Sequence, residues 1–196
     1  MLYLSEMKRL LTILILIFTL QTPSWADDIQ DFQIEGMSIG DSLLDFMNED
    51  EINMNDLKFY PDDSKYYEIE YAGKSDIFES VSMHIKRNDK KYEIYTIRAF
   101  FYIDGKSACL KKREEIVKDI KSLFNDVFFE EGNIKHYLYK DSMQYIVQFS
   151  FQPKKKYTDH IRIECFIAGK KSKKEVASGL NLISSSSKFE KWLDSL

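Results

Sequence analysis

Alternation of apolar and polar positions predicts a β-rich chain. Six segments alternate with a period of two over at least part of their length, at 67–71, 81–85, 92–103, 134–140, 145–151 and 161–167. A period of two is typical of strands that bury one face. The segment 92–103 is apolar on both faces near its end, which favours a central strand. We expect turns at 87–90, 131–133 and 141–142, the last two bounding a strand that forms a hairpin with 145–151.

A helical period marks the residues between these two groups of strands. In 106–125, Cys109, Ile116 and Ile120 fall on one stripe while Lys and Glu residues occupy the other side. This pattern predicts a long amphipathic helix that packs on the sheet.

Three shorter helices are expected from capping patterns and apolar spacing. Ser38 with Asp41 predicts a helix that ends near Asn48, and Ser172 with Glu175 predicts one of two to three turns. After the serines at 184–187, a last short helix presents Phe189, Trp192, Leu193 and Leu196 on one face. The fold class is therefore α+β, an antiparallel sheet with a long helix packed on one face.

A five-residue pattern that occurs twice suggests two copies of one structural unit. The pattern Ile-acid-Gly-x-Ser occurs at 34–38 and again at 103–107, each time between a predicted strand and a predicted helix. Repeat halves at 31–103 and 104–183 would then form a single domain over 27–196. The alternative is convergence on a good helix start, because Gly allows the turn and Ser caps a helix in any fold.

Two helix-then-meander units, the first opened by Gly36-Met37-Ser38, resemble the β-lactamase-inhibitor-like architecture and the outer-membrane assembly proteins of the SmpA/OmlA type. The motif part of the resemblance covers 34–46. The lipid-bearing cysteine expected of the assembly proteins is absent, and the aromatic-rich loops of the inhibitors have no match. The resemblance implies a non-catalytic module that binds a protein or the cell envelope, and it transfers no binding residues.

The N-terminus has the form of a secretory signal. Lys8 and Arg9 precede an apolar run at 10–20, and small residues stand at Ser24 and Ala26. We expect a signal peptide at 1–26, cleaved after Ala26, and hence a periplasmic or secreted protein. The alternative is an uncleaved anchor, for which the apolar run is short.

The net charge of the chain gives no reason to expect a nucleic-acid partner. The chain has 28 Lys+Arg against 32 Asp+Glu, a net charge of −4, so no nucleic-acid partner is expected. Acidic residues dominate 27–105 and basic residues dominate the rest. The basic excess suggests binding to an anionic membrane surface or an acidic envelope protein, the alternative being solvated turns. The lysines concerned are Lys154, Lys155, Lys156, Lys170, Lys171, Lys173 and Lys174.

The two cysteines fall on apolar positions of different elements. Cys109 lies on the apolar stripe of the long helix, and Cys165 alternates with Ile161, Ile163 and Ile167. In an oxidising compartment this suggests a disulfide where the helix packs on the sheet. Two buried, unpaired thiols are the alternative.

Two motifs in the N-terminal part of the chain match hydrolase signatures. Residues 40–43 read Gly-Asp-Ser-Leu, and 36–40 read Gly-x-Ser-x-Gly. A GDSL-type hydrolase would use Ser42 with His160 and Asp159. In the residues before Gly36, apolar positions alternate with polar or acidic ones, which does not fit the buried parallel strand that precedes such a nucleophile. The further sequence motifs of a GDSL-type hydrolase are also missing later in the chain. We therefore expect no catalytic residues and no enzyme, with the Ser42 esterase as the alternative.

Metal and cofactor chemistry lacks support in the sequence. His84, His136 and His160 each stand alone in a predicted strand without a second ligand at i+2 or i+4, so exposed positions on a sheet face are expected. The acidic pairs 114–115 and 130–131 are read as solvated. The sequence thus predicts a non-enzymatic binding module of the cell envelope, without metal or cofactor.

Overall fold

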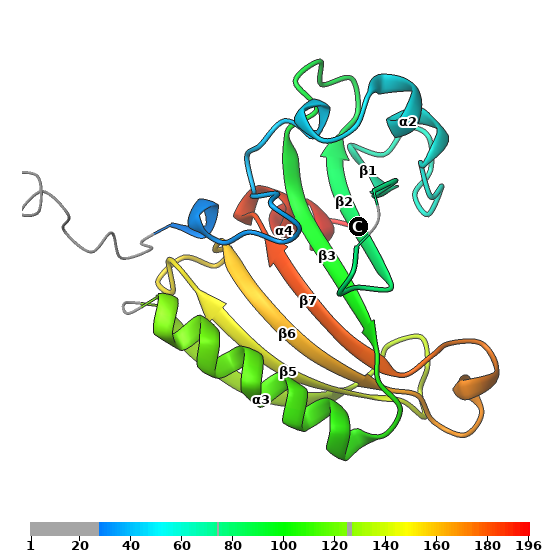
Figure 1. The fold of residues 1–196 in the computed structure, drawn as a ribbon, viewed down its shortest axis with the longest axis vertical. Coiled ribbons are helices and arrows are strands. Elements are labelled where there is room, and N and C mark those ends of the chain that lie inside the picture. Colours follow the sequence, from blue (N-terminus) through cyan, green and yellow to red (C-terminus); the bar gives the residue numbers. More distant parts are fainter. Residues whose placement is uncertain (1–27, 74, 125–126) are drawn as a thin grey trace, which may run out of the picture.

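The computed structural model describes residues 28–73, 75–124 and 127–196 (Figure 1). The strands are β1 (Tyr66–Glu70), β2 (Ser80–Lys86), β3 (Ile94–Tyr102), β4 (Phe128–Lys135), β5 (Met143–Ser150), β6 (His160–Ile167) and β7 (Gly179–Ser185). The helices are α2 (Glu49–Met54), α3 (Lys106–Leu123) and α4 (Ser187–Leu193), and 3-10 turns lie at η1 (Ile29–Asp31), η2 (Leu43–Asp45) and η3 (Ser172–Lys174).

The strands form one antiparallel sheet in the order β1-β2-β3-β7-β6-β5-β4. The first three strands make one meander and the last four make another. The chain leaves β3 near the middle of the sheet, passes through α3 and enters β4 at the far edge (Figure 1). It then returns strand by strand until β7 pairs with β3. The predicted α+β class and antiparallel sheet are confirmed.

One face of the sheet carries the main hydrophobic core. Val81, Ala99, Leu182, Ile163 and Val147 are successive cross-strand neighbours in one row across five strands. Each is at most 7% exposed. Side chains directly opposite one another on antiparallel strands share a face, so this row forms a continuous apolar layer.

Helix α3 packs on that face, mainly against β6 and also against β7 (Figure 1). Cys109 and Ile120 on its apolar stripe are buried in the same core as Ile163. The predicted helix at 106–125 is thus confirmed, ending at Leu123. Figure 1 also shows α4 lying beside the β3 and β7 ends, where Phe189 is buried in a separate aromatic cluster.

The helix predicted from Ser38 to Asn48 is wrong. Gly40 adopts a φ of +93°, and its N–H donates to the Ile94 carbonyl at 2.9 Å, while the Leu43 N–H donates to the Tyr92 carbonyl at 2.9 Å. These bonds to the residues that lead into β3 replace the i to i−4 bonds of a helix. The apolar side chains of the segment still enter the core, and α2 begins only after Asn48, which caps it.

The helix predicted to follow Ser172 is also wrong. Only η3 forms there, and 179–185 is the central strand β7. Leu180 and Leu182 point to the apolar face, and Asn181 lies opposite Phe100 on the other face. The local helix start is overruled because the gap between β3 and β6 offers β7 hydrogen-bond partners on both sides.

The turn predicted at 131–133 lies inside β4, which runs from Phe128 to Lys135. Every residue of this edge strand is exposed, so no apolar alternation marked it in the sequence. A hairpin with β5 does form, but the strand predicted at 134–140 is wrong: β4 pairs with β5 over 128–135, and most of the predicted strand lies in the turn at 136–142.

The predicted repeat halves are not seen in the structure. The first meander has three strands and only the six-residue α2, whereas the second has four strands and the long α3. The expected signal peptide at 1–26 lies outside the described residues. Within the described part of the chain, no helix has the length and apolar character needed to span a bilayer.

Candidate functional site

The second face of the sheet is polar, and part of it is open. One row across it contains Glu68, His84, Thr96, Ser185 and His160, each directly opposite the next. All five are at most 6% exposed. Buried polar side chains cost free energy unless they are paired, so a row of them on a sheet face marks a place where function can reside.

A groove opens beside this row, over β1, β2 and β3. It has a volume of about 280 Å³, close to the lower end of small-ligand sites. The 57–59 loop and β3 contribute apolar side chains to it, and the strands contribute polar ones. The lining residues are Leu57, Phe59, Glu68, Glu70, Ser80, Ser82, Arg98, Phe100 and Asn181.

Arg98 is the exposed cation of the groove. Its side chain is 49% exposed. The Nε–H donates to Asn181 Oδ1 at 3.3 Å, and Nη1 lies 4.0 Å from Glu68 Oε1. Asn181 therefore orients the guanidinium, and about half of the Arg98 side chain remains open to a ligand.

Glu68 is buried on the floor of the groove. Its Oε1 accepts a hydrogen bond from the Ser82 hydroxyl at 2.6 Å, and its Oε2 lies 3.8 Å from His84 Nε2. Burial lowers the pKa of His84 to about 3, and the nearby Arg98 charge acts in the same direction. His84 is thus neutral at pH 7, and its contact with Glu68 is no ion pair.

Aromatic side chains enclose His84, the neighbour of Glu68 in the polar row. The Phe189 ring of α4 lies 4.4 Å from the His84 ring, and the Tyr60 ring lies 5.6 Å from it. Tyr60 in turn contacts Trp192 at 5.3 Å between ring centroids. Neither nitrogen of His84 has a hydrogen-bond partner. This apolar enclosure explains why the imidazole stays neutral.

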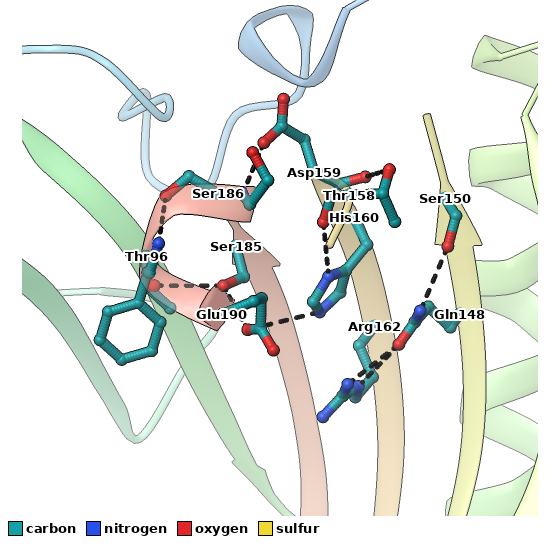
Figure 2. Close-up of polar contacts among 12 residues, drawn as sticks. Thr96, Gln148, Ser150, Thr158, Asp159, His160, Arg162, Ser185, Ser186 and Glu190 are labelled. Carbon is teal, nitrogen blue, oxygen red and sulfur yellow. Dashed lines mark hydrogen bonds and ion pairs between the residues drawn. The ribbon is translucent and has the colours of Figure 1, made fainter. Parts of the chain in front are cut away.

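A second polar cluster lies farther along the same row, under α4. Figure 2 shows the Glu190 side chain reaching from α4 toward Ser185 and His160. The Ser185 hydroxyl donates to Glu190 Oε1 at 2.7 Å, and its Oγ lies 3.3 Å from Thr96 Oγ1. These contacts fix α4 to the two central strands.

His160 in this cluster faces Glu190 without a hydrogen bond to it. Its Nδ1 lies 3.3 Å from the Thr158 carbonyl, and its Nε2 lies 3.9 Å from Glu190 Oε1 (Figure 2). A carbonyl only accepts, so the contact places the proton on Nδ1 and leaves Nε2 unprotonated. Burial lowers the pKa of His160, and Arg162 adds to the effect. The predicted exposure of the sheet histidines is therefore wrong for His84 and His160, while His136 lies outside the strands, in the β4–β5 turn.

Arg162 belongs to a separate chain of contacts on the same face. Its Nε and Nη2 donate to Gln148 Oε1 at 3.2 and 2.9 Å, and Gln148 Nε2 donates to the Ser150 hydroxyl at 3.2 Å (Figure 2). This pairing holds the guanidinium along β5 and away from the groove.

The residues of the hydrolase alternative have separate partners. The Ser42 hydroxyl donates to the Lys91 carbonyl at 2.8 Å. Asp159 Oδ1 accepts from the Ser187 N–H at 2.6 Å, at the start of α4. Asp159 and His160 are neighbours at the start of β6, and the described contacts do not join either of them to Ser42.

Cys109 and Cys165 form a disulfide, with 2.09 Å between their Sγ atoms. It joins α3 to β6 on the apolar face, as the helical and strand patterns predicted. Of the two alternatives left by the sequence, the structure thus has the bonded one.

The predicted basic residues fall into two groups. Lys154, Lys155 and Lys156 lie in the β5–β6 connection, and the lysines at 170–174 lie in the β6–β7 connection. These connections stand at opposite ends of β6, so the lysines form two patches. Lys156 contacts Asp194 at 3.0 Å, and Lys173 contacts Asp104 at 3.8 Å.

Sequence reasoning missed the groove. The signals were present as period-two polar positions: Glu68 and Glu70 on β1, Ser82 and His84 on β2, and Arg98 within an otherwise apolar run. Their meeting depends on the register of three strands. Asn181 was missed because its segment was read as a helix.

No family model, no curated protein and no solved structure matches this chain. Over the described residues, no group of three or more His, Cys, Asp or Glu side chains is placed to hold a metal ion.

Proposed function

We propose that the protein is a non-catalytic binding protein of the periplasm or extracellular space, and that the groove over β1, β2 and β3 holds its ligand. The disulfide between Cys109 and Cys165 supports an oxidising compartment. The observation that carries the proposal is the half-exposed Arg98 guanidinium, which Asn181 orients in a groove that apolar side chains also line.

The charges of the groove favour a small zwitterionic ligand. Glu70, Ser82 and Arg98 are directly opposite one another on β1, β2 and β3. Two strand spacings separate Glu70 from Arg98, about 10 Å at the backbone. Both side chains are exposed. A ligand with a carboxylate at Arg98 and an ammonium group at Glu70 would span β2, with an apolar group against Phe59 and Phe100.

A free dipeptide with apolar side chains is the probe that tests this arrangement. We expect saturable binding by isothermal titration calorimetry, and loss of binding when the peptide is acetylated at one end or amidated at the other. Each blocked end removes one charge that the groove would pair.

Variants of the groove make the test specific. Arg98→Gln and Glu70→Gln should each weaken binding at least about tenfold, the effect of one lost charge-assisted hydrogen bond. Glu114→Gln, on the exposed side of α3, is the matched control and should bind as the wild type does. Equal binding of blocked and free peptides, or unchanged affinity in both groove variants, contradicts the proposal.

The serine-hydrolase alternative has less support, because the Ser42 hydroxyl is held by the Lys91 carbonyl. Turnover of short acyl esters provides its test. Activity that Ser42→Ala abolishes in a folded protein would replace the binding proposal.

A further inference from the structure

The two edges of the sheet differ in whether another segment of the chain covers them. At the β1 edge, the Leu57 N–H donates to the Glu68 carbonyl at 3.0 Å, and the Glu70 N–H donates to the Asn55 carbonyl at 3.0 Å. Residues 55–57 thus cover that edge. In the described part of the chain, β4 has β5 as its strand partner and no strand on its other side.

The β4 edge also exposes large apolar side chains. Between 128 and 138, the side chains of Phe128, Phe129, Ile134, Tyr137 and Leu138 are 37 to 71% exposed. Soluble proteins protect open edges by charge, proline or a covering segment, because an open apolar edge pairs with other strands. The concentration of apolar groups at this edge therefore indicates an interaction surface.

The hydrogen-bond ladder sets which groups face outward. The His136 N–H donates to the Ser142 carbonyl at 3.1 Å. Because bonded and unbonded pairs alternate along an antiparallel ladder, even-numbered residues of β4 bond to β5. The N–H and C=O groups of Phe129, Glu131, Asn133 and Lys135 then point to the open edge.

We propose that this edge binds the same edge of a second copy, so that two antiparallel β4 strands join two sheets into one about a two-fold axis. Because the odd-numbered residues of β4 have the outward-pointing backbone groups, they must pair with odd-numbered residues of the second copy. The two-fold axis of such an antiparallel pair is normal to the sheet, so α3 lies on the same side of the joined sheet in both copies. Each contact across such an axis is made twice.

Charge selects the register. A two-fold centred on Glu131 sets like carboxylates opposite each other, and one centred on Gly132 sets Glu131 opposite Asn133. A two-fold centred on Asn133 sets Glu131 of each copy opposite Lys135 of the other. Glu131 accepts from Arg113 at 2.5 Å through Oε1, but its side chain is 53% exposed, so its second oxygen can take part in this pair. The same register brings Phe129 toward Tyr137 of the second copy.

The size of the purified protein across a range of concentrations tests this proposal. We expect a reversible dimer by sedimentation velocity. Lys135→Glu and Glu131→Lys should each raise the dimer dissociation constant at least about tenfold, because two opposite-charge pairs become two like-charge pairs. Lys90→Glu, the same reversal in the distant β2–β3 turn, should leave the dimer unchanged.

Mixing the two variants separates pairing from damage to the fold. A heterodimer of Lys135→Glu with Glu131→Lys restores an opposite-charge pair at both positions, so the mixture should dimerise more tightly than either variant alone. A wild-type monomer up to about 200 µM, far above the dissociation constants of specific complexes, would overturn the proposal. So would a mixture that stays monomeric while the wild type dimerises.

Discussion

Single residues on the polar face show how strongly position changes chemistry. His84 and His160 lie in one row of the sheet, and both are enclosed by α4 and neighbouring strands. Each stands within 4 Å of a carboxylate, yet burial holds its pKa low. Desolvation outweighs the attraction of the acid, since a charged imidazole here would lose its hydration without gaining a hydrogen bond.

Replacing His84 with Phe should flatten the pH dependence of stability. In the unfolded chain the histidine gains a proton below about pH 6.5, whereas in the folded protein its pKa is about 3, with Glu68, Arg98 and Tyr60 around it. Stability is therefore full above pH 6.5 and falls as the pH is lowered. Between pH 6.5 and 5 the loss due to His84 is about 2 kcal/mol.

Urea unfolding at pH 8 and pH 5 measures this effect. We expect His84→Phe to be about as stable as the wild type at pH 8, because neither ring nitrogen of His84 makes a hydrogen bond and Phe fits among the same rings. At pH 5 the variant should be the more stable protein. An undiminished loss of stability in His84→Phe would show that other groups cause it.

At the level of elements, the local sequence pattern predicted a helix or strand correctly where it agreed with the hydrogen-bond partners that the fold provides for that segment. The long stripe of α3 and the alternation of β2, β3, β5 and β6 all formed as expected. The helices predicted at Ser38 and Ser172 did not form, because in each case strands distant in sequence provide backbone partners. An N-terminal capping pattern decides only the first turn of a helix.

A glycine substitution tests the close packing of β7 against β3. A Cβ at Gly179 would overlap the Phe101 carbonyl oxygen, whereas one at Gly132 on β4 would meet no atom within 4 Å. We expect Gly179→Ala to lower the free energy of unfolding by about 1 to 3 kcal/mol, the usual cost of overpacking. Gly132→Ala serves as its control and should be neutral. Equal stability of the two variants in denaturant titrations would argue against this packing.

The disulfide between Cys109 and Cys165 links α3 to β6 covalently. It closes a loop with a sequence separation of 56 residues, which on the chain-entropy model stabilises the fold by about 4 kcal/mol. The double variant Cys109→Ala/Cys165→Ala should show that loss in urea unfolding. Thiol titration of the denatured, unreduced wild type should find no free thiol, and two free thiols would contradict the bond.

For the whole molecule, the sheet separates the basic residues that sequence reasoning grouped together. Lys154 and Lys155 lie at one end of β6, and Lys170 and Lys171 lie at the other. Eight strand residues span about 23 Å, more than two screening lengths at physiological salt. The two groups therefore act as separate patches of positive charge.

Charge reversal tests whether either lysine group binds an anionic membrane. Lys154 and Lys155 stand beside Lys156, which contacts Asp194, whereas Lys170 and Lys171 lie near Asp141, whose Oδ2 accepts from the Lys171 N–H. We expect Lys154→Glu/Lys155→Glu to weaken sedimentation with phosphatidylserine vesicles, and Lys170→Glu/Lys171→Glu to have little effect. Vesicle binding that neither double variant changes would exclude membrane contact through these lysines.

The sequence by itself determined the elements with a strong period: the strands β1, β2, β3, β5 and β6, the amphipathic α3 and the two cysteines on apolar positions. These follow from side-chain periodicity, which a single segment carries within itself. Only the tertiary structure decided that 38–48 and 179–185 pair with β3, that Glu70 and Arg98 share a groove, and that β4 is an open edge. Those outcomes depend on which backbone groups find partners across the sheet, and the partners come from segments far apart in the chain.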